Sequence, residues 1–216
     1  LRKLPEQVKH WIPKGPQGAT VFSVDGRWLK LLRATGPRSN RTITTLLAHP
    51  IEGMSDEDVL QWLTQAYLAK AFEPGLVIVA NPSPLTTTRL FTLPSIDPAE
   101  IRDIVELQAE KHTPYAKEEI LADFRIIETD RSGYSRVLLV LSHQDIVHRG
   151  LKLVEGMGWL LERVGFELEG LVNWFRVVQR GSPSDTTLVA ELDTQTTTLV
   201  VVHQGNPYFH RSLSIG

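Results

Sequence analysis

The chain of 216 residues contains no cysteine, and that absence removes several kinds of chemistry at once. A disulfide framework, a thiolate metal site and a cysteine nucleophile are all excluded. The sequence also lacks any apolar run near the roughly 18 to 20 residues that a membrane-spanning helix needs. No apolar segment follows the basic first residues, as it would in a signal peptide. Because the chain starts with Leu1 and stops just after a predicted strand, we expect it to be a piece of a longer protein. Whether that longer protein has a membrane anchor is left open.

The composition is otherwise that of a globular protein with one or two compact domains, with 42% apolar and 22% charged residues. Charge is unevenly placed. Residues 1–50 hold nine Lys and Arg against Glu6 and Asp25, whereas the remainder has a net charge of −9. A basic edge can face anionic lipid or nucleic acid. We favour a solvated face and expect no nucleic-acid partner, because aromatic residues do not alternate with the basic ones as in single-strand binding proteins.

The first 80 residues predict antiparallel strands, then a helix, then a further strand. Asp25-Gly26 between two short apolar runs is a strong hairpin signal. Ser55 and Asp58 form an acidic variant of the capping box at the start of the helix. The expected strands are 20–24, 28–32, 42–48 and 76–80, and the helix runs from Ser55 until Pro74-Gly75 ends it.

A boundary at Asn81-Pro-Ser-Pro84 separates this part from a small α/β module. Asp97 is the predicted N-cap of the module's helix, with Pro98 at the first helical position, where a missing N–H costs nothing. We expect strands at 87–93, 123–128, 136–141 and 163–169, helices from Asp97 to His112, 144–157 and 172–179, and a linker at 181–184.

The closing stretch, residues 188–216, predicts three strands joined by tight turns. The first strand ends at an acidic and polar turn from Glu191 to Gln195, and the second runs through residues 199–202. Residues 204–207 turn the second strand into the third.

Taken in order, several segments resemble PilM, the actin-like protein of type IV pilus assembly, and the related cytoplasmic domain of GspL in type II secretion. Together they cover nearly all of residues 20–216, and their order and spacing carry the likeness. The segments are 22–30, 89–94 with the helix 99–110 and the corner 112–115, 123–126, 158–169, 173–180 and the closing hairpin with 209–211.

The resemblance implies an α/β protein with the actin-like ATPase, or ribonuclease H-like, fold. The chain would hold the first half of that fold, with a small inserted α/β subdomain, and the beginning of the second half. The implied parts are a flexible arm at 1–18, subdomain 1A at 19–81 and 143–182, the inserted subdomain 1C at 82–142, and a truncated start of subdomain 2A at 183–216.

Two turns hold phosphate in the actin-like superfamily, with an acid, then a glycine two residues later. Glycine lets backbone N–H groups approach phosphate closely, while the acid positions Mg²⁺ or water. The corresponding positions are Ser23, Asp25 and Gly26 in the first turn, and Glu191, Asp193 and Thr194 in the second. Asp25 and Asp193 replace the glycines, so we expect that this fragment has lost the cofactor site. If the alignment to the first turn is shifted by one residue, Asp25-Gly26 supplies the acid and a glycine. Binding of ATP and Mg²⁺ by the full-length parent is therefore left open.

Other groups of polar residues indicate a functional site only weakly, and we expect neither a metal site nor catalytic residues. His143 and His148 lie five residues apart without an acid to complete a metal face, and His112 ends a helix, where a cation suits the dipole. Ser23 lacks the Gly-x-Ser-x-Gly elbow of a hydrolase. Four acids could imitate the two-Mg²⁺ cluster of a ribonuclease H-type nuclease, but one of them lies in the inserted module. These acids are Asp25, Asp123, Glu191 and Asp193.

The resemblance implies a non-catalytic scaffold on the cytoplasmic side of the bacterial inner membrane, either peripheral to it or anchored in it. Such a protein binds the cytoplasmic tail of a bitopic membrane protein similar to PilN and links it to a motor ATPase. Self-association is a further expectation. The alternative is a nucleotide-binding ATPase or phosphotransferase of the actin and sugar-kinase superfamily.

Overall fold

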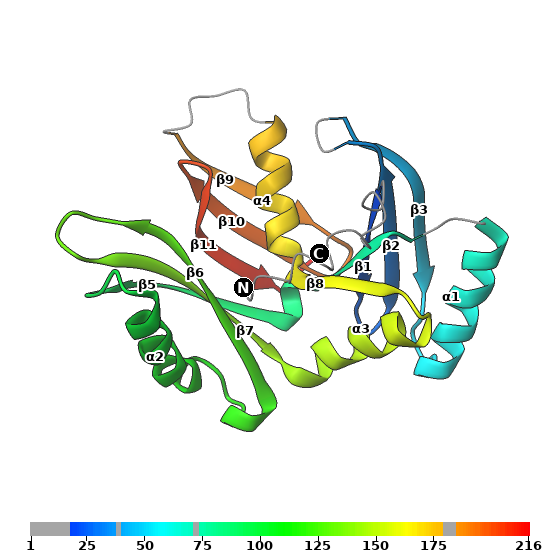
Figure 1. Cartoon of the computed structure of the whole chain (residues 1–216), viewed down its shortest axis with the longest axis horizontal. Helices are drawn as coiled ribbons and strands as arrows, with labels where there is room; N and C mark the ends of the chain where they lie inside the picture. Colours follow the sequence, from blue (N-terminus) through cyan, green and yellow to red (C-terminus); the bar gives the residue numbers. More distant parts are fainter. Residues whose placement is uncertain (1–17, 38–39, 71–73, 179–184) are drawn as a thin grey trace, which may run out of the picture. The chain divides into compact units, whose positions relative to one another are not determined.

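The computed structural model describes residues 18–37, 40–70, 74–178 and 185–216. Apart from Gly18, the predicted arm at 1–18 lies outside the described residues, as does the predicted linker at 181–184. The chain folds as two compact units, each built from more than one segment (Figure 1). The first comprises the described residues up to Ala80 with Arg149–Gly165, and the second comprises Asn81–His148 with Phe166–Gly216.

The first unit is built on a five-stranded sheet with the order β3-β2-β1-β4-β8. Strand β1 runs antiparallel to β2 and parallel to β4, and β2 runs antiparallel to β3. Its elements are β1 (Gly18–Val24), β2 (Trp28–Thr35), β3 (Thr42–Pro50), α1 (Asp56–Lys70), β4 (Leu76–Asn81), α3 (Gln144–Gly156, which begins in the second unit) and β8 (Leu160–Phe166). The four strands and the one helix predicted for residues 20–80 are therefore confirmed.

The core of the first unit lies between one face of this sheet and helices α1 and α3. Alternate strand residues point to opposite faces, so each strand contributes every second side chain to this core. Helix α3 approaches the sheet closely, because a Cβ at Gly150 would lie 2.7 Å from Val79 Cγ1. The most buried members are Phe22, Leu29, Leu31, Val77 and Val79 from the strands, Val59 and Leu63 from α1, and Leu153 and Val154 from α3.

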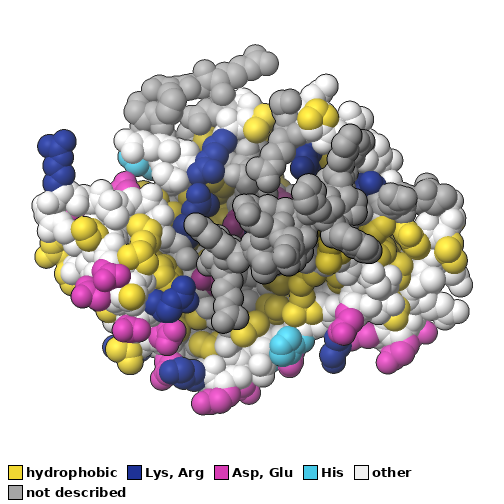
Figure 2. Space-filling view, in the orientation of Figure 1, with side chains coloured by type: hydrophobic (Ala, Val, Ile, Leu, Met, Phe, Trp, Pro, Cys, Tyr) yellow, Lys and Arg dark blue, Asp and Glu magenta, His cyan; other side chains and the backbone are white. Residues whose placement is uncertain are grey.

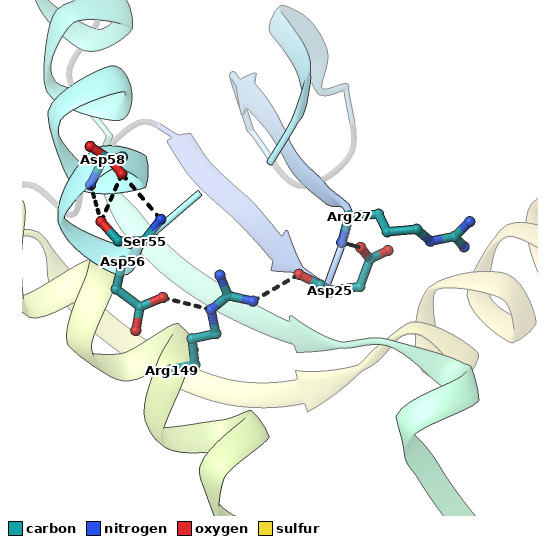
Figure 3. Close-up of polar contacts among 6 residues, drawn as sticks. All are labelled: Asp25, Arg27, Ser55, Asp56, Asp58 and Arg149. Atoms are coloured by element: carbon teal, nitrogen blue, oxygen red, sulfur yellow. Dashed lines mark hydrogen bonds and ion pairs between the residues drawn. The ribbon is translucent and has the colours of Figure 1, made fainter. Parts of the chain in front are cut away.

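The predicted cap of α1 is present in the structure. Ser55 Oγ accepts a hydrogen bond from the Asp58 backbone N–H at 3.1 Å, and the Asp58 carboxylate accepts one from the Ser55 backbone N–H at 3.2 Å (Figure 3). These reciprocal bonds satisfy two backbone donors that the first turn of a helix leaves unpaired.

The second unit contains two three-stranded sheets, ordered β5-β7-β6 and β11-β10-β9. Its elements are β5 (Thr86–Leu93), α2 (Pro98–Ala109), the short 3₁₀ turn η3 (Glu110–His112), β6 (Ile120–Thr129), β7 (Ser135–His143), α4 (Glu167–Val178), β9 (Thr186–Leu192), β10 (Thr197–His203) and β11 (Asn206–Leu213). In the described residues of both units, no helix combines the length and the apolar character needed to cross a membrane.

Helix α2 starts where the sequence predicts, since the Asp97 carboxylate accepts a hydrogen bond from Ala99 N at 2.8 Å. The buried face of the helix has Ile101, Val105 and Ala109, which pack in one cluster with apolar residues of β5 and β7. Burial and the charges of Arg89 and Lys111 lower the pKa of His112. These two effects oppose the preference of the helix dipole for a histidine cation at this helix end.

Helix α4 begins five residues earlier than the sequence predicts. The strand expected at 163–169 is β8, which ends at Phe166, and Glu167 opens the helix. Leu168, Val172 and Phe175 recur at helical spacing and are all buried against β10, so the packing favours a helix from Glu167 onward. Glu167 and Glu169 in the first turn suit the positive end of the helix dipole.

The turn between β10 and β11 is a two-residue hairpin loop. Gln204 and Gly205 have φ values of 50° and 72°, the paired left-handed conformation of a type I′ turn. Arg176 of α4 supports the loop, because its Nε donates to the Gly205 carbonyl and its Nη2 donates to Asn206 Oδ1. These bonds connect the turn between β10 and β11 to α4, the helix that packs on their sheet.

His210 of β11 joins the two sheets of the second unit. Its Nδ1 lies 2.9 Å from the Thr88 hydroxyl of β5, and its Nε2 is buried without a hydrogen-bond partner among the described residues. Burial of the ring lowers the pKa of His210 from 6.5 to about 4. The folded protein therefore favours the neutral imidazole at this position.

This pKa shift predicts a loss of stability in mild acid. Because the pKa of His210 is lower in the folded than in the unfolded chain, its contribution is complete above about pH 6.5 and is lost as the pH falls toward 4. The loss amounts to at most about 3 kcal/mol. Denaturant unfolding between pH 7.5 and 4.5 should show a smaller loss for His210→Gln than for the wild type. The matched change His148→Gln, at an exposed position of α3, should keep the wild-type slope, and equal slopes for all three proteins would contradict the assignment.

Candidate functional site

The first predicted phosphate turn lies between β1 and β2 and is closed by its own aspartate. Asp25 Oδ1 accepts hydrogen bonds from the backbone N–H groups of Arg27 and Trp28, both at 2.6 Å. The Asp25 backbone N–H donates to the Trp28 carbonyl at 3.0 Å. Asparagine and aspartate favour this local arrangement, in which the side chain bonds to the backbone two residues further on.

This arrangement occupies backbone N–H groups that a bound phosphate would need. Anion-binding turns work through backbone N–H groups that point at the ligand. Here a carboxylate already takes the N–H groups of Arg27 and Trp28. A phosphate at the same place would have to displace the carboxylate and would also meet its negative charge, a repulsion of roughly 1 to 4 kcal/mol depending on screening.

The other predicted residues of the first turn differ in accessibility. Ser23, at the position of the family's acid, is only 9% exposed within β1. Gly26 is exposed, and a Cβ added there would meet no atom within 4 Å. The backbone of this turn therefore does not require glycine at position 26, and Ser23 offers no carboxylate for Mg²⁺.

Arg149 of α3 binds the backbone of the first turn. Its Nη1 donates to the Asp25 carbonyl at 3.1 Å, and its Nε donates to Asp56 Oδ1 at 2.8 Å (Figure 3). Asp56 is the first residue of α1, so a single guanidinium connects the turn, α1 and α3. The sequence gives no sign of this contact, because 124 residues separate Arg149 from Asp25.

The second predicted turn connects β9 to β10 in the other unit, and its aspartate bonds to the backbone of the next residue rather than to residues two and three positions further on. Asp193 Oδ1 accepts a hydrogen bond from Thr194 N at 2.7 Å, and Asp193 N donates to the Thr196 carbonyl at 2.9 Å. Glu191, Asp193 and Thr194 are all exposed. In both turns, an aspartate at the glycine position thus accepts hydrogen bonds from its own turn.

The remaining candidate residues are not gathered into a site within either unit. Asp123 lies in the second unit and Asp25 in the first, and the Asp123 carboxylate accepts from the backbone N–H of Phe124 at 2.8 Å. His143 Nδ1 lies 3.6 Å from Asp145 Oδ2. Over the described parts of the chain, no group of three or more His, Asp or Glu residues is placed to hold a metal ion.

The sheets, their order and the two turns define an actin-like ATPase fold, and comparison with solved structures confirms that prediction. The chain is similar to the PilM–PilN type IV pilus biogenesis complex, with a TM-score of 0.74 and 18% identity over 91% of this chain and 61% of the matching one. It therefore spans about three fifths of that matching chain.

Two further solved structures share the fold. One is the cytoplasmic domain of EpsL, an inner-membrane component of the type II secretion system of Vibrio cholerae, with a TM-score of 0.59 and 10% identity over 91% of this chain and 71% of that one. The other is a Bacteroides thetaiotaomicron protein of unknown function with an actin-like ATPase fold, with a TM-score of 0.58 and 12% identity over 93% and 71%. No family model and no curated protein matches the sequence. At these identities the likeness establishes the fold alone.

The contacts of Arg149 predict a measurable stability effect. Arg149→Met should lower the free energy of unfolding by about 1 to 2 kcal/mol, because it removes charge-assisted bonds to Asp25 and Asp56. Chemical denaturation would measure the change, and a double-mutant cycle with Asp56→Asn should show coupling between the two side chains. The control is Lys152→Met at an exposed position of the same helix. Equal effects of the two methionine substitutions would contradict the proposed role of Arg149.

Proposed function

We propose that this chain is the actin-fold part of a non-catalytic scaffold in a type IV pilus or type II secretion assembly platform. The scaffold acts on the cytoplasmic side of the inner membrane. There it binds the cytoplasmic tail of a bitopic membrane protein and links that protein to a motor ATPase.

One observation carries the non-catalytic part of this proposal. The carboxylates of Asp25 and Asp193 accept backbone hydrogen bonds inside the turns that hold phosphate elsewhere in the superfamily. Each turn therefore places an acid at the position where the superfamily's phosphate turns have glycine. A protein that keeps the fold and closes these turns is better suited to protein binding than to phosphoryl transfer.

The partner in the proposal is supported by the fold comparison. The similar pilus structure is a complex of PilM with PilN, and the similar secretion structure is a domain of an inner-membrane component. This chain shares the architecture of both structures across 91% of its length. We carry over to this chain the binding of a PilN-like tail. Extended tails commonly bind by strand addition combined with side-chain pockets.

The alternative is a nucleotide-binding ATPase or phosphotransferase, and the open surface around Gly26 favours it. A Cβ at this position would meet nothing within 4 Å, so a ligand can approach the backbone there. In that case Asp25 would be the acid of a turn shifted by one residue, and it would have to leave its backbone partners to serve Mg²⁺.

A nucleotide titration of the full-length parent protein separates the two functions. By isothermal titration calorimetry we expect no Mg-ATP binding up to about 1 mM, a limit equivalent to roughly 4 kcal/mol of affinity. Asp25→Ala should leave this result unchanged. Asp130→Ala is the matched control, because Asp130 accepts backbone N–H bonds from Ser132 and Tyr134 in the same way within another turn. Binding by the wild type that is lost in Asp25→Ala but kept in Asp130→Ala would establish the alternative.

A crosslinking pull-down tests the scaffold itself. The chain serves as bait in a membrane extract of its own source, with bound proteins identified by mass spectrometry. We expect a bitopic inner-membrane protein with a short cytoplasmic tail, or a hexameric secretion ATPase. A synthetic peptide of the recovered tail should then bind the purified chain, while a scrambled peptide should not. Recovery of soluble metabolic proteins alone would contradict the scaffold proposal.

A further inference from the structure

Strand β3 forms one edge of the described five-stranded sheet. It is nine residues long and pairs with β2 along one side only. Such an edge leaves a row of backbone N–H and C=O groups that can pair with another strand. Natural proteins usually protect an edge of this length with lysine, proline or an inward-pointing charge. Strand β3 has no Lys, Arg, Asp or Glu, and its single proline, Pro50, is its last residue.

A β-bulge places two apolar side chains of β3, those of Ile43 and Leu46, on the same open face. The pairing with β2 shifts between Arg33, which faces Thr45, and Ala34, which faces Ile43. The extra residue brings Ile43 onto the same face as Leu46, although the two are an odd number of positions apart. This face points away from the core, and Ile43 and Leu46 are 60% and 71% exposed. Figure 2 shows hydrophobic side chains at the surface on the right of the view, where β3 and α1 lie.

The charges at the two ends of β3 have opposite signs. Arg41 is exposed just before the strand, and Glu52 is exposed just after it. Two copies of β3 that run antiparallel would place Arg41 of each copy near Glu52 of the other. A parallel arrangement would instead bring Arg41 beside Arg41 and Glu52 beside Glu52, which like charges disfavour. The strand is therefore complementary to itself in the antiparallel direction.

We propose that β3 is the contact surface for a second copy of this chain. Two β3 strands pair antiparallel about a two-fold axis, so that the sheets of two first units become one continuous sheet. Leu46 lies at the middle of β3 and meets the Leu46 of the other copy, which removes the most exposed apolar side chain of the strand from water. This interface uses the first unit alone and does not depend on the scaffold proposal.

Sedimentation equilibrium of the 216-residue chain tests the proposal at concentrations from about 1 to 200 µM, a range suited to weak association. The wild type should approach twice the mass of one chain as the concentration rises. Leu46→Lys should remain monomeric, since lysine on an edge strand opposes pairing. The control Leu121→Lys changes another exposed leucine, 44% accessible, on the edge strand β6 and should dimerise as the wild type does.

Charge reversal distinguishes this interface from any other. Arg41→Glu and Glu52→Arg should each weaken dimerisation by about tenfold, and the double variant should recover to near the wild-type affinity, because both charge pairs are restored in reverse. Circular dichroism confirms that each variant is folded, and if Leu46→Lys is not, Ile43→Lys replaces it. A wild type that is monomeric throughout, a dimer that survives Leu46→Lys, or a double variant without recovery would each overturn the proposal. Pairing of β3 with a segment of another protein, found with a monomeric wild type, would also overturn it.

Discussion

The carboxylate of Asp25, bonded to two backbone N–H groups of its own turn, is the interaction on which the rest of the site depends. It closes the β1–β2 connection, and it leaves the Asp25 carbonyl directed toward Arg149. Arg149 in turn pairs with Asp56 at the start of α1. Through Arg149, one turn is therefore connected to the middle of α3 and to the first residue of α1, two helices that cover the same sheet. The same interaction occupies the N–H groups that a phosphate would require.

In both turns an aspartate stands at the position where the family resemblance places a glycine. A turn that binds phosphate needs unoccupied N–H groups and room for the anion. The Asp25 carboxylate accepts hydrogen bonds from two backbone N–H groups of its turn, and the Asp193 carboxylate accepts one from Thr194 N. The chain shares its architecture with the pilus and secretion structures across 91% of its length. The shared fold, together with the internal bonding of Asp25, is the physical basis for proposing a scaffold.

Much of the local structure follows from short-range rules, and those predictions hold. The caps at Ser55 and Asp97 are formed by side chains within three residues of the groups they bond. The start of α4 is different, because residues 167–169 are compatible with either a strand or a helix. Burial of Leu168 against the sheet of β9, β10 and β11 selects the helix, and that sheet is formed by later residues. The start of α4 therefore depends on tertiary packing, which a short stretch of sequence does not reveal.

The sequence by itself determined the strand and helix order, the caps and the replacement of two glycines by aspartates, because periodicity, capping and turn chemistry act over a few residues. It also carried the resemblance that predicts the fold. The tertiary structure alone decided that Arg149 joins Asp25 to Asp56, that His210 is buried against Thr88, and that a bulge turns Ile43 to the side of Leu46. These features depend on segments that are distant in the chain or on strand register, and both are fixed only when the sheets and helices pack.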